Sequence, residues 1–219
     1  MPVRLGSVRT RRKNLRPFGD TTLFEHALRF RKSRSLSRLY VAAYEPEFEE
    51  ILERYPDVVF IKRSRRSAEG EDLESIYDFL GDIEEDYLAT INTCLPFLRL
   101  ETFDAAIEYY RGHLFPTMVG ACEAPGWYFT GDTHRLVNAG AEGVINSKNL
   151  MPLLKSSPAV LCWHRRRVME EKRFWTMAAD DPHLYLLPPE ECIDIDTELE
   201  FEIAEALFVH RQRTGRLQL

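Results

Sequence analysis

The chain has 219 residues, of which 44% are hydrophobic and 29% charged, and its formal net charge is −6. This length is enough for one domain with its own core, so we expect a single domain over residues 1–219. No apolar run approaches the roughly 20 residues that span a bilayer, and the first residues show no signal-peptide pattern. The mildly acidic balance argues against the broad basic face that nucleic-acid binding needs. We therefore expect neither a membrane nor a nucleic acid as a partner.

The cysteines are far apart in the sequence, and none forms a paired C-x-x-C spacing. They are Cys94, Cys122, Cys162 and Cys192. This usage favours reduced thiols over a zinc site or a disulfide framework. We accordingly expect a cytoplasmic protein.

Apolar spacing along the first half of the chain predicts alternating helices and strands. Helices are expected in segments 23–28, 46–55, 73–80 and 103–110, and strands at 39–43, 58–61 and 87–92. The segment 62–72 is polar and carries no such pattern. Strand and helix alternating at this rhythm indicate an α/β fold, with a mainly parallel, mixed sheet covered by helices on both faces.

The pattern loosens between about residues 123 and 155, which we interpret as an insertion. Within it, segment 126–132 resembles a β-hairpin or an excursion from the sheet. Such an insertion can shape a substrate pocket or a subunit contact, and the sequence does not decide between them. Strands are expected again at 159–163 and 184–187, with a short helix at 165–172 between them.

The first candidate functional stretch is a basic segment at residues 2–17, in which Arg and Lys occur without any acidic residue. Gly6 and Ser7 form a small, flexible turn inside it. A loop of this kind can bring backbone N–H groups close to an anion while basic side chains close over it. The segment therefore predicts a phosphate-binding loop, although a solvated basic arm has the same composition.

The second candidate stretch lies near the other end of the chain, at Ile193–Glu200. If Ile193–Asp196 is extended, both isoleucines face the core and Asp194 and Asp196 face one opening. Two carboxylates on one face repel each other unless a cation or proton lies between them, and Mg²⁺ suits such oxygen ligands. Alternatively, both aspartates support the start of a C-terminal helix, which Thr197 and Glu200 cap as a capping box.

Together the two stretches resemble the acylneuraminate cytidylyltransferases, also called CMP-sialic acid synthetases. That family opens with a Pro-Ala-Arg-x-Gly-Ser loop ending in Lys-Asn, which residues 2–7 and Lys13-Asn14 match. It closes on Ile-Asp-Ile-Asp-Thr-Glu-Leu-Asp-Phe, which residues 193–201 match with Glu200 in place of one aspartate. The resemblance implies a nucleotide-diphospho-sugar transferase-like fold and a homodimer. It also implies transfer of CMP from CTP to a sialic-acid-like (nonulosonic) 2-keto sugar acid, with release of pyrophosphate.

The resemblance also assigns roles to individual residues. Arg4 and Lys13 would hold the CTP phosphates, and Asp194 and Asp196 would hold Mg²⁺. The remaining nucleotide contacts would come from Gly6, Ser7, Asn14, Arg63 near the cytosine and Asn92 near the ribose.

Departures from the family pattern leave alternatives open. The family's first strand lies mid-sheet, and this chain starts at Met1, immediately before the loop, so we expect that strand to be missing. The family's Ser-Thr-Asp after the second strand is replaced by Ala42-Ala43-Tyr44. The acceptor is accordingly open between acylneuraminate, legionaminate or pseudaminate and, alternatively, 3-deoxy-manno-octulosonate. A non-catalytic, truncated relative is a further alternative.

Overall fold

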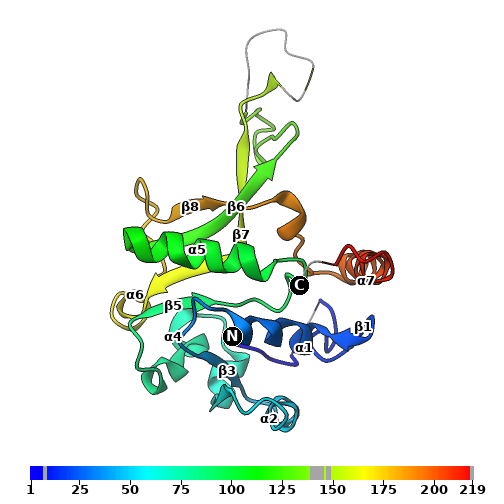
Figure 1. The fold of residues 1–219 in the computed structure, drawn as a ribbon. Helices are drawn as coiled ribbons and strands as arrows, with labels where there is room; N and C mark the ends of the chain where they lie inside the picture. Colours follow the sequence, from blue (N-terminus) through cyan, green and yellow to red (C-terminus); the bar gives the residue numbers. More distant parts are fainter. Residues whose placement is uncertain (7–8, 139–145, 147–148, 218–219) are drawn as a thin grey trace.

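The computed structural model describes residues 1–6, 9–138, 146 and 149–217 (Figure 1). Its strands are β1 (Pro17–Phe18), β2 (Thr21–Thr22), β3 (Leu39–Ala43), β4 (Val58–Lys62), β5 (Tyr87–Thr90), β6 (Thr117–Ala124), β7 (Leu153–His164) and β8 (His183–Leu186). Its α-helices are α1 (Leu23–Ala27), α2 (Pro46–Leu52), α3 (Arg65–Glu69), α4 (Leu73–Ile76), α5 (Leu100–His113), α6 (Arg165–Met169) and α7 (Glu198–Arg213). Short 3₁₀ helices are η1 (Leu28–Lys32), η2 (Asp78–Asp82) and η4 (Pro189–Glu191).

Apart from the short antiparallel pair β1–β2, the described strands form a central layer in two hydrogen-bonded blocks. β3 and β4 pair in parallel, and a four-stranded sheet follows in the order β5-β7-β6-β8. β7 runs antiparallel to β5 and β6, whereas β6 and β8 are parallel. The expected α/β fold with a mixed sheet is therefore confirmed.

Both faces of this layer are buried. Successive side chains along a strand point to opposite faces, so one strand can contribute to two cores. In β7, Val160 and Cys162 join one core with residues of α1, α2 and α5. Leu161 and Trp163 of the same strand join a second core with residues of η2 and α6. Helices thus cover both faces, as the sequence predicts.

The predicted strands at 39–43, 58–61 and 87–92 are present as β3, β4 and β5. β6 was not predicted, although it lies inside the four-stranded sheet and is almost wholly buried. Small residues weaken its strand signal, and at Gly120 the small residue has a packing reason. A Cβ at Gly120 would lie 2.6 Å from the Leu187 side chain and 2.9 Å from the Ser157 carbonyl oxygen. The helix α3 was not predicted either, since Ala68 is the single apolar residue of its segment.

Beyond the sheet, the ends of β6 and β7 project as an arm away from the rest of the fold (Figure 1). Within the arm, Phe129 and Leu136 form an antiparallel bridge, so the expected hairpin-like excursion is present. Residues 139–145, 147 and 148 of this insertion lie outside the described part of the chain. The described arm carries exposed apolar side chains, which include Trp127, Phe129 and Met151.

At the start of the chain, the segment before the basic loop lies beside β3 without forming a full strand. Pro2 and Ala42 form a single parallel bridge, and the Val3 amide donates to the Ala42 carbonyl at 2.9 Å. The described residues thus contribute one bridge beside β3 at this edge. Among the helices that the structure describes, none has the length and apolar character needed to cross a membrane.

Candidate active site

The candidate site lies where the segments that follow β3, β4 and β5 come together. Glu45 follows β3, Arg63 follows β4, and Asn92 lies shortly after β5. Leu5 of the basic loop contacts Glu45, and Asn14 contacts Thr93. In α/β sheets, ligands bind in the crevice outside the carboxyl ends of the strands, which makes this the expected place for a ligand.

Asn14 fixes the basic loop from within. The residue is 6% exposed. Its Nδ2 donates to the Arg4 carbonyl at 2.9 Å, and its Oδ1 accepts from the Thr93 hydroxyl at 2.6 Å. Asn14, which the resemblance assigns to the nucleotide, thus joins the two ends of the loop to each other and to the segment after β5.

Glu45 is a site residue that the sequence analysis did not identify. Its Oε1 accepts a hydrogen bond from the Leu5 amide at 2.7 Å, a charge-assisted bond that holds the loop backbone. Its Oε2 is buried, and the described residues give it no hydrogen-bond partner. A buried oxygen without a partner indicates a place where a ligand or water binds. The only sequence signal was an acidic residue directly before the Pro46 that opens α2.

Arg63 is buried, with 4% of its surface exposed. Its guanidinium donates to the carbonyl oxygens of Val3 at 3.4 Å and Ile76 at 3.2 Å, and also to the carbonyl and hydroxyl of Ser67. Burial lowers the pKa of this guanidinium. The residue that the resemblance places near the cytosine therefore holds the start of the basic loop against α3 and the end of α4.

The other loop and nucleotide residues are placed less tightly. Arg4 is exposed and donates to the Ala68 carbonyl at 3.2 Å. Gly6 has open space around it, since an added Cβ would meet nothing within 4 Å. Asn92 accepts the Cys94 amide at 3.0 Å through its side chain. Ser7 lies outside the described residues.

The basic loop meets the closing motif directly. Lys13 donates from Nζ to the Ile195 carbonyl at 2.6 Å and lies 3.9 Å from Asp196 Oδ1. Arg9 donates to the same Asp196 oxygen at 2.8 Å across 187 positions of sequence. The two stretches singled out from the sequence therefore share one site.

In the closing motif, the expected alternation is present. Ile195 is fully buried among the residues of α7, and Ile193 packs against the same cluster. Thr197 and Glu200 form the predicted capping box at the start of α7. Asp194 Oδ1 is buried without a partner in the described part of the chain. Burial, and then the negative charge of Asp196, raise the pKa of the Asp194 carboxyl.

A cation fits this carboxylate pair. Asp194 has an unpaired buried oxygen, and its electrostatic coupling to Asp196 is repulsive. Mg²⁺ commonly binds through one or two carboxylates and completes its shell with waters and substrate phosphates. Within the described residues, no cluster of three or more His, Cys, Asp or Glu side chains forms a closed metal cage. The donor set thus suits a metal shared with a phosphate ligand.

Lys155 is a second residue that sequence reasoning missed. It lies on β7 and interacts electrostatically with Asp194 and Glu200. Its positive charge partly offsets the raised pKa of Asp194, and it adds to the lowered pKa of Glu200, which backbone hydrogen bonds from Asp196 and Thr197 mainly cause. Nothing near Lys155 in the sequence marks it, because the strand register alone brings it to the site. With Arg9 and Lys13, it surrounds the acidic pair with positive charge, an arrangement that attracts an anionic ligand.

The fold and this site define an α/β protein of the nucleotide-diphospho-sugar transferase-like type. Residues 1–138 match the family model described as cytidylyltransferase, more than half of the chain. The protein therefore belongs to the cytidylyltransferase family. A comparison with the sequences of curated proteins gave no match.

Solved structures share the fold at low sequence identity. A CMP:2-keto-3-deoxy-manno-octonic acid synthetase complexed with CTP is 13% identical, has a TM-score of 0.69, and is matched over 96% of this chain and 97% of its own. The 4-diphosphocytidyl-2C-methyl-D-erythritol synthase of Anaerococcus prevotii is 12% identical with a TM-score of 0.64, over 94% of both chains. A cytidylyltransferase of Leptospira borgpetersenii is 14% identical with a TM-score of 0.57, over 99% of this chain and 94% of its own.

Proposed function

We propose that this cytidylyltransferase uses CTP and Mg²⁺ to activate a sialic-acid-like 2-keto sugar acid. The anomeric hydroxyl of the sugar acid would attack the α-phosphorus of CTP. A new oxygen–phosphorus bond forms as the bond to the β-phosphate oxygen breaks, so that CMP-sugar and pyrophosphate leave and the hydroxyl proton is released. The observation that carries this proposal is the contact of Lys13 and Arg9 with the Asp194–Asp196 motif.

CTP as the nucleotide is supported by the family of the chain and by CTP in the similar structure with a TM-score of 0.69. The basic loop supplies Lys13, Arg9 and backbone amides near Gly6 for the triphosphate. Such groups work by positioning the reactants and by neutralising charge that develops on the leaving pyrophosphate. In the free protein, Lys13 is bonded to Ile195 and Arg9 to Asp196, so nucleotide binding would redirect both cations.

Asp194 and Asp196 would hold Mg²⁺, which when bound supplies positive charge next to the α-phosphate. The residues themselves support this through the unpaired Oδ1 of Asp194 and the exposed side of Asp196. Lys155 would balance the negative charge of the motif until metal and nucleotide bind.

The sugar acid is proposed from the motifs of the basic loop and of Ile193–Phe201. Arg12-Lys13-Asn14 resembles the loop of enzymes that act on sialic-type sugars. A CMP:2-keto-3-deoxy-manno-octonic acid synthetase has a similar fold, so an eight-carbon 2-keto sugar acid is the second candidate acceptor. Both candidates share the 2-keto acid chemistry and belong to nucleotide-sugar biosynthesis.

A homodimer is proposed through the arm beyond the sheet. Its described part exposes Trp127 at 41%, Phe129 at 59% and Met151 at 51% of their surfaces. Contiguous exposed apolar side chains commonly mark contacts with another chain. Sedimentation of the full chain checks this, and a monomer at all concentrations tested would contradict it.

The experiment that tests the function uses the full chain with CTP, MgCl₂ and a panel of nine-carbon and eight-carbon 2-keto sugar acids. We expect pyrophosphate release that needs CTP and an acceptor, with a nine-carbon acid preferred. Stabilisation by CTP and Mg²⁺ without turnover on any acceptor would favour the non-catalytic alternative, because a ligand that binds the native state raises its stability. No response to any nucleotide would contradict the proposal.

A further inference from the structure

Two of the four free thiols lie together beside the candidate site. Cys122 is buried on β6, and Cys192 is half-buried directly after η4. The side chains of Cys192 and Cys122 are in hydrogen-bonding contact, and Cys192 also contacts the hydroxyl of Ser157 on β7. Neither thiol has a part in the reaction proposed above, so their contact calls for a separate explanation.

The backbone around Cys122 explains why the two thiols meet. Gly120 and Cys122 are two residues apart on β6, so their side-chain positions lie on one face of the sheet. Leu187 packs on that face against Gly120, and its amide donates to the Ala121 carbonyl at 2.8 Å. After η4, Cys192 packs against the same core as Leu187. The contact between the thiols therefore follows from strand register and core packing.

The thiol pair is close to the acidic pair of the closing motif. Lys155 on β7 is the register partner of Cys122 on β6. Lys155 also interacts electrostatically with Asp194, which follows Cys192 by two residues. Two extended residues span at most about 7 Å, so a displacement of Cys192 is felt at Asp194. The thiols are therefore placed to affect one of the two carboxylates.

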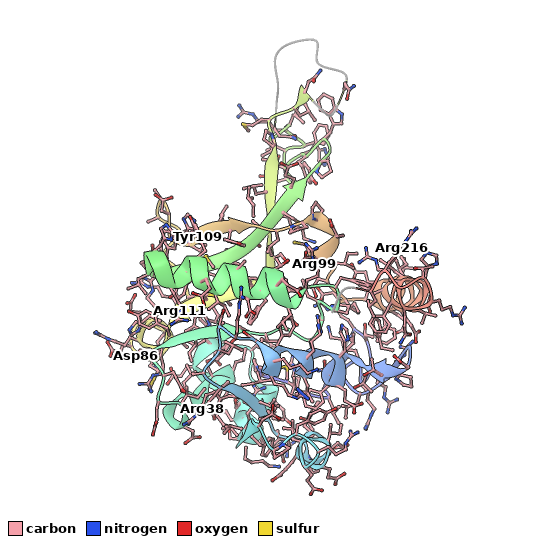
Figure 2. The ribbon with its side chains drawn as sticks, in the orientation of Figure 1. Arg38, Asp86, Arg99, Tyr109, Arg111 and Arg216 are labelled. Carbon is pink, nitrogen blue, oxygen red and sulfur yellow. The ribbon has the colours of Figure 1, made fainter. Side chains whose placement is uncertain are left out.

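The chain is anchored on both sides of this short segment. Before it, Glu191 is 1% exposed and accepts a hydrogen bond at 3.0 Å from the amide of Arg99, which Figure 2 labels near the start of α5. After it, the Ile195 amide donates at 3.0 Å to a carbonyl in the segment that follows β5. A movement of Cys192 is therefore taken up between these anchors, where Asp194 lies.

We propose that Cys122 and Cys192 form a reversible disulfide that acts as a redox switch on the closing motif. The oxidant is a small disulfide of the glutathione class. A sulfur–sulfur bond forms between the two cysteines as the sulfur–sulfur bond of the oxidant breaks. Two electrons and the two thiol protons pass to the oxidant, which leaves as two thiols. A thiol reductant reverses the step.

The disulfide changes the spacing of the two carboxylates. A bond brings the sulfurs closer than any contact between thiols. Cys122 is held in the ladder to β7, so Cys192 moves and Asp194 moves with it. Asp196 stays with α7, because its amide donates to Glu200 at 2.9 Å. Mg²⁺ demands nearly ideal ligand geometry, so the oxidised form binds CTP and Mg²⁺ more weakly, a consequence that rests on the proposed function.

The experiment treats the reduced full chain with glutathione disulfide. Long incubation at mildly alkaline pH is needed, because burial raises the pKa of the Cys192 thiol to about 11 and slows exchange. Peptide mapping after alkylation locates the disulfide. Hydrogen exchange of residues 193–196 and calorimetric titration with CTP and MgCl₂ then compare the oxidised and reduced chains.

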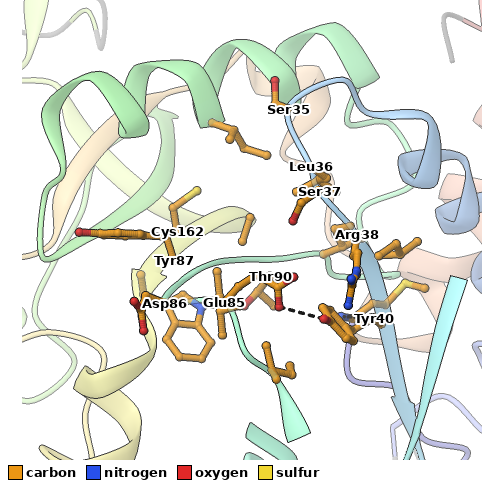
Figure 3. Close-up of a pocket in the computed structure, with 18 of the residues that line it drawn as sticks. Ser35, Leu36, Ser37, Arg38, Tyr40, Glu85, Asp86, Tyr87, Thr90 and Cys162 are labelled. Carbon is orange, nitrogen blue, oxygen red and sulfur yellow. Dashed lines mark hydrogen bonds between the residues drawn. The ribbon is translucent and has the colours of Figure 1, made fainter.

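Three variants serve as comparisons. Cys122→Ser and Cys192→Ser each remove one member of the pair, so the test stands even if one of them fails to fold. Cys162→Ser is the control. Cys162 lines a cavity of about 690 Å³ beside β5, and neither member of the pair lines that cavity (Figure 3).

We expect a disulfide between Cys122 and Cys192 in the parent and in Cys162→Ser, and dithiothreitol should reverse it. The oxidised chain should show altered exchange at residues 193–196 and about tenfold weaker binding of CTP, a size usual for coupled sites. Cys122→Ser and Cys192→Ser should show neither change.

A chain that stays unlinked would overturn the proposal, and so would one that retains a single glutathione on Cys192. A mapped disulfide with unchanged exchange at residues 193–196, or with unchanged affinity for CTP, would overturn the switch. A reduced chain that binds no CTP would contradict the proposed function instead. In that case the mapped disulfide and the hydrogen exchange still decide this inference.

Discussion

The carboxyl ends of β3 and β5 differ from the edges of the same strands in which polar groups have hydrogen-bond partners. At the carboxyl ends, Asn14 and Arg63 join distant segments, and the unpaired buried oxygens belong to Glu45 and Asp194. Along the edges, β3 pairs with β4 on one side, and on the other the described segment Met1–Val3 adds one bridge and three hydrogen bonds. The edges of β3 are thus held by backbone hydrogen bonds, whereas the unpaired side-chain oxygens indicate where a ligand or water binds.

The largest effect should follow from removing the negative charge of Asp196 in the candidate site. Asp196→Asn keeps the size of the side chain but weakens its contacts with Arg9 and Lys13 and with any bound metal. We expect kcat to fall roughly a hundredfold to a thousandfold, since single electrostatic contacts to a transition state have effects of that size. Steady-state pyrophosphate release measures this. Glu202→Gln, an exposed position on α7, is the matched control. Activity within twofold of the parent in Asp196→Asn would remove the aspartate pair from the mechanism.

Arg63→Ala should have the largest effect on stability. It leaves the carbonyls of Val3, Ser67 and Ile76 without their buried donor. Hydrogen bonds to a charged group contribute about 1.5–3 kcal/mol, so the Tm should fall by about 4 °C or more. Calorimetry gives the Tm, and Arg65→Ala, which removes an exposed pair with Glu69, is the control. Equal Tm values for the two variants would show that Arg63 does not hold the loop.

His26 should make the fold acid-sensitive. Burial, followed by the charge of Arg29, lowers the pKa of His26 from 6.5 to about 3. Below about pH 6.5 His26 is therefore protonated in the unfolded chain but stays neutral in the folded chain. The free energy of unfolding decreases as the pH falls from about 6.5 toward 3. At pH 5 the loss is about 2 kcal/mol.

The measurement for His26 is urea unfolding of the parent and His26→Gln at several pH values. The free energy of unfolding should decrease with acid more steeply in the parent. Because His26 packs on Phe208 of α7, the comparison also reports on the support of the closing motif. Identical pH slopes in the two proteins would contradict the assignment.

Glu45→Ala should have the smallest effect of the four. It removes the acceptor of the Leu5 amide and loosens the basic loop without removing any cation. We expect CTP to bind about tenfold more weakly, which corresponds to about 1.4 kcal/mol, while Glu45→Gln keeps an acceptor and most of the affinity. Calorimetric titration with CTP and Mg²⁺ separates the variants. Equal affinity of Glu45→Ala and the parent would show that the loop needs no such anchor.

The sequence predicts a structural feature where neighbouring residues determine it, and fails where tertiary contacts determine it. The strands β3 and β4 and the capping box at Thr197 follow from neighbouring residues, and the sequence predicts them correctly. The basic loop and the motif at Ile193–Phe201 were singled out from the sequence as candidate functional stretches. Glu45 and Lys155 were missed because their roles come from tertiary contacts with residues far along the chain.

Two further differences have the same origin. β6 was not predicted because small residues interrupt its strand pattern, and at Gly120 a close approach of Leu187 and the Ser157 carbonyl leaves no room for a Cβ. The structure gives the side chains of Asn14 and Arg63 protein partners, which no pattern in the sequence reveals.

The most direct measurement of the central claim is CTP-dependent pyrophosphate release by the parent chain and by Lys13→Ala, with Lys32→Ala as an exposed control outside the site. We predict release with a 2-keto sugar acid in the parent and the control, and a loss of roughly a hundredfold or more in Lys13→Ala. Equal release by Lys13→Ala and the parent would contradict the claim that the basic loop and the closing aspartates form one nucleotide site.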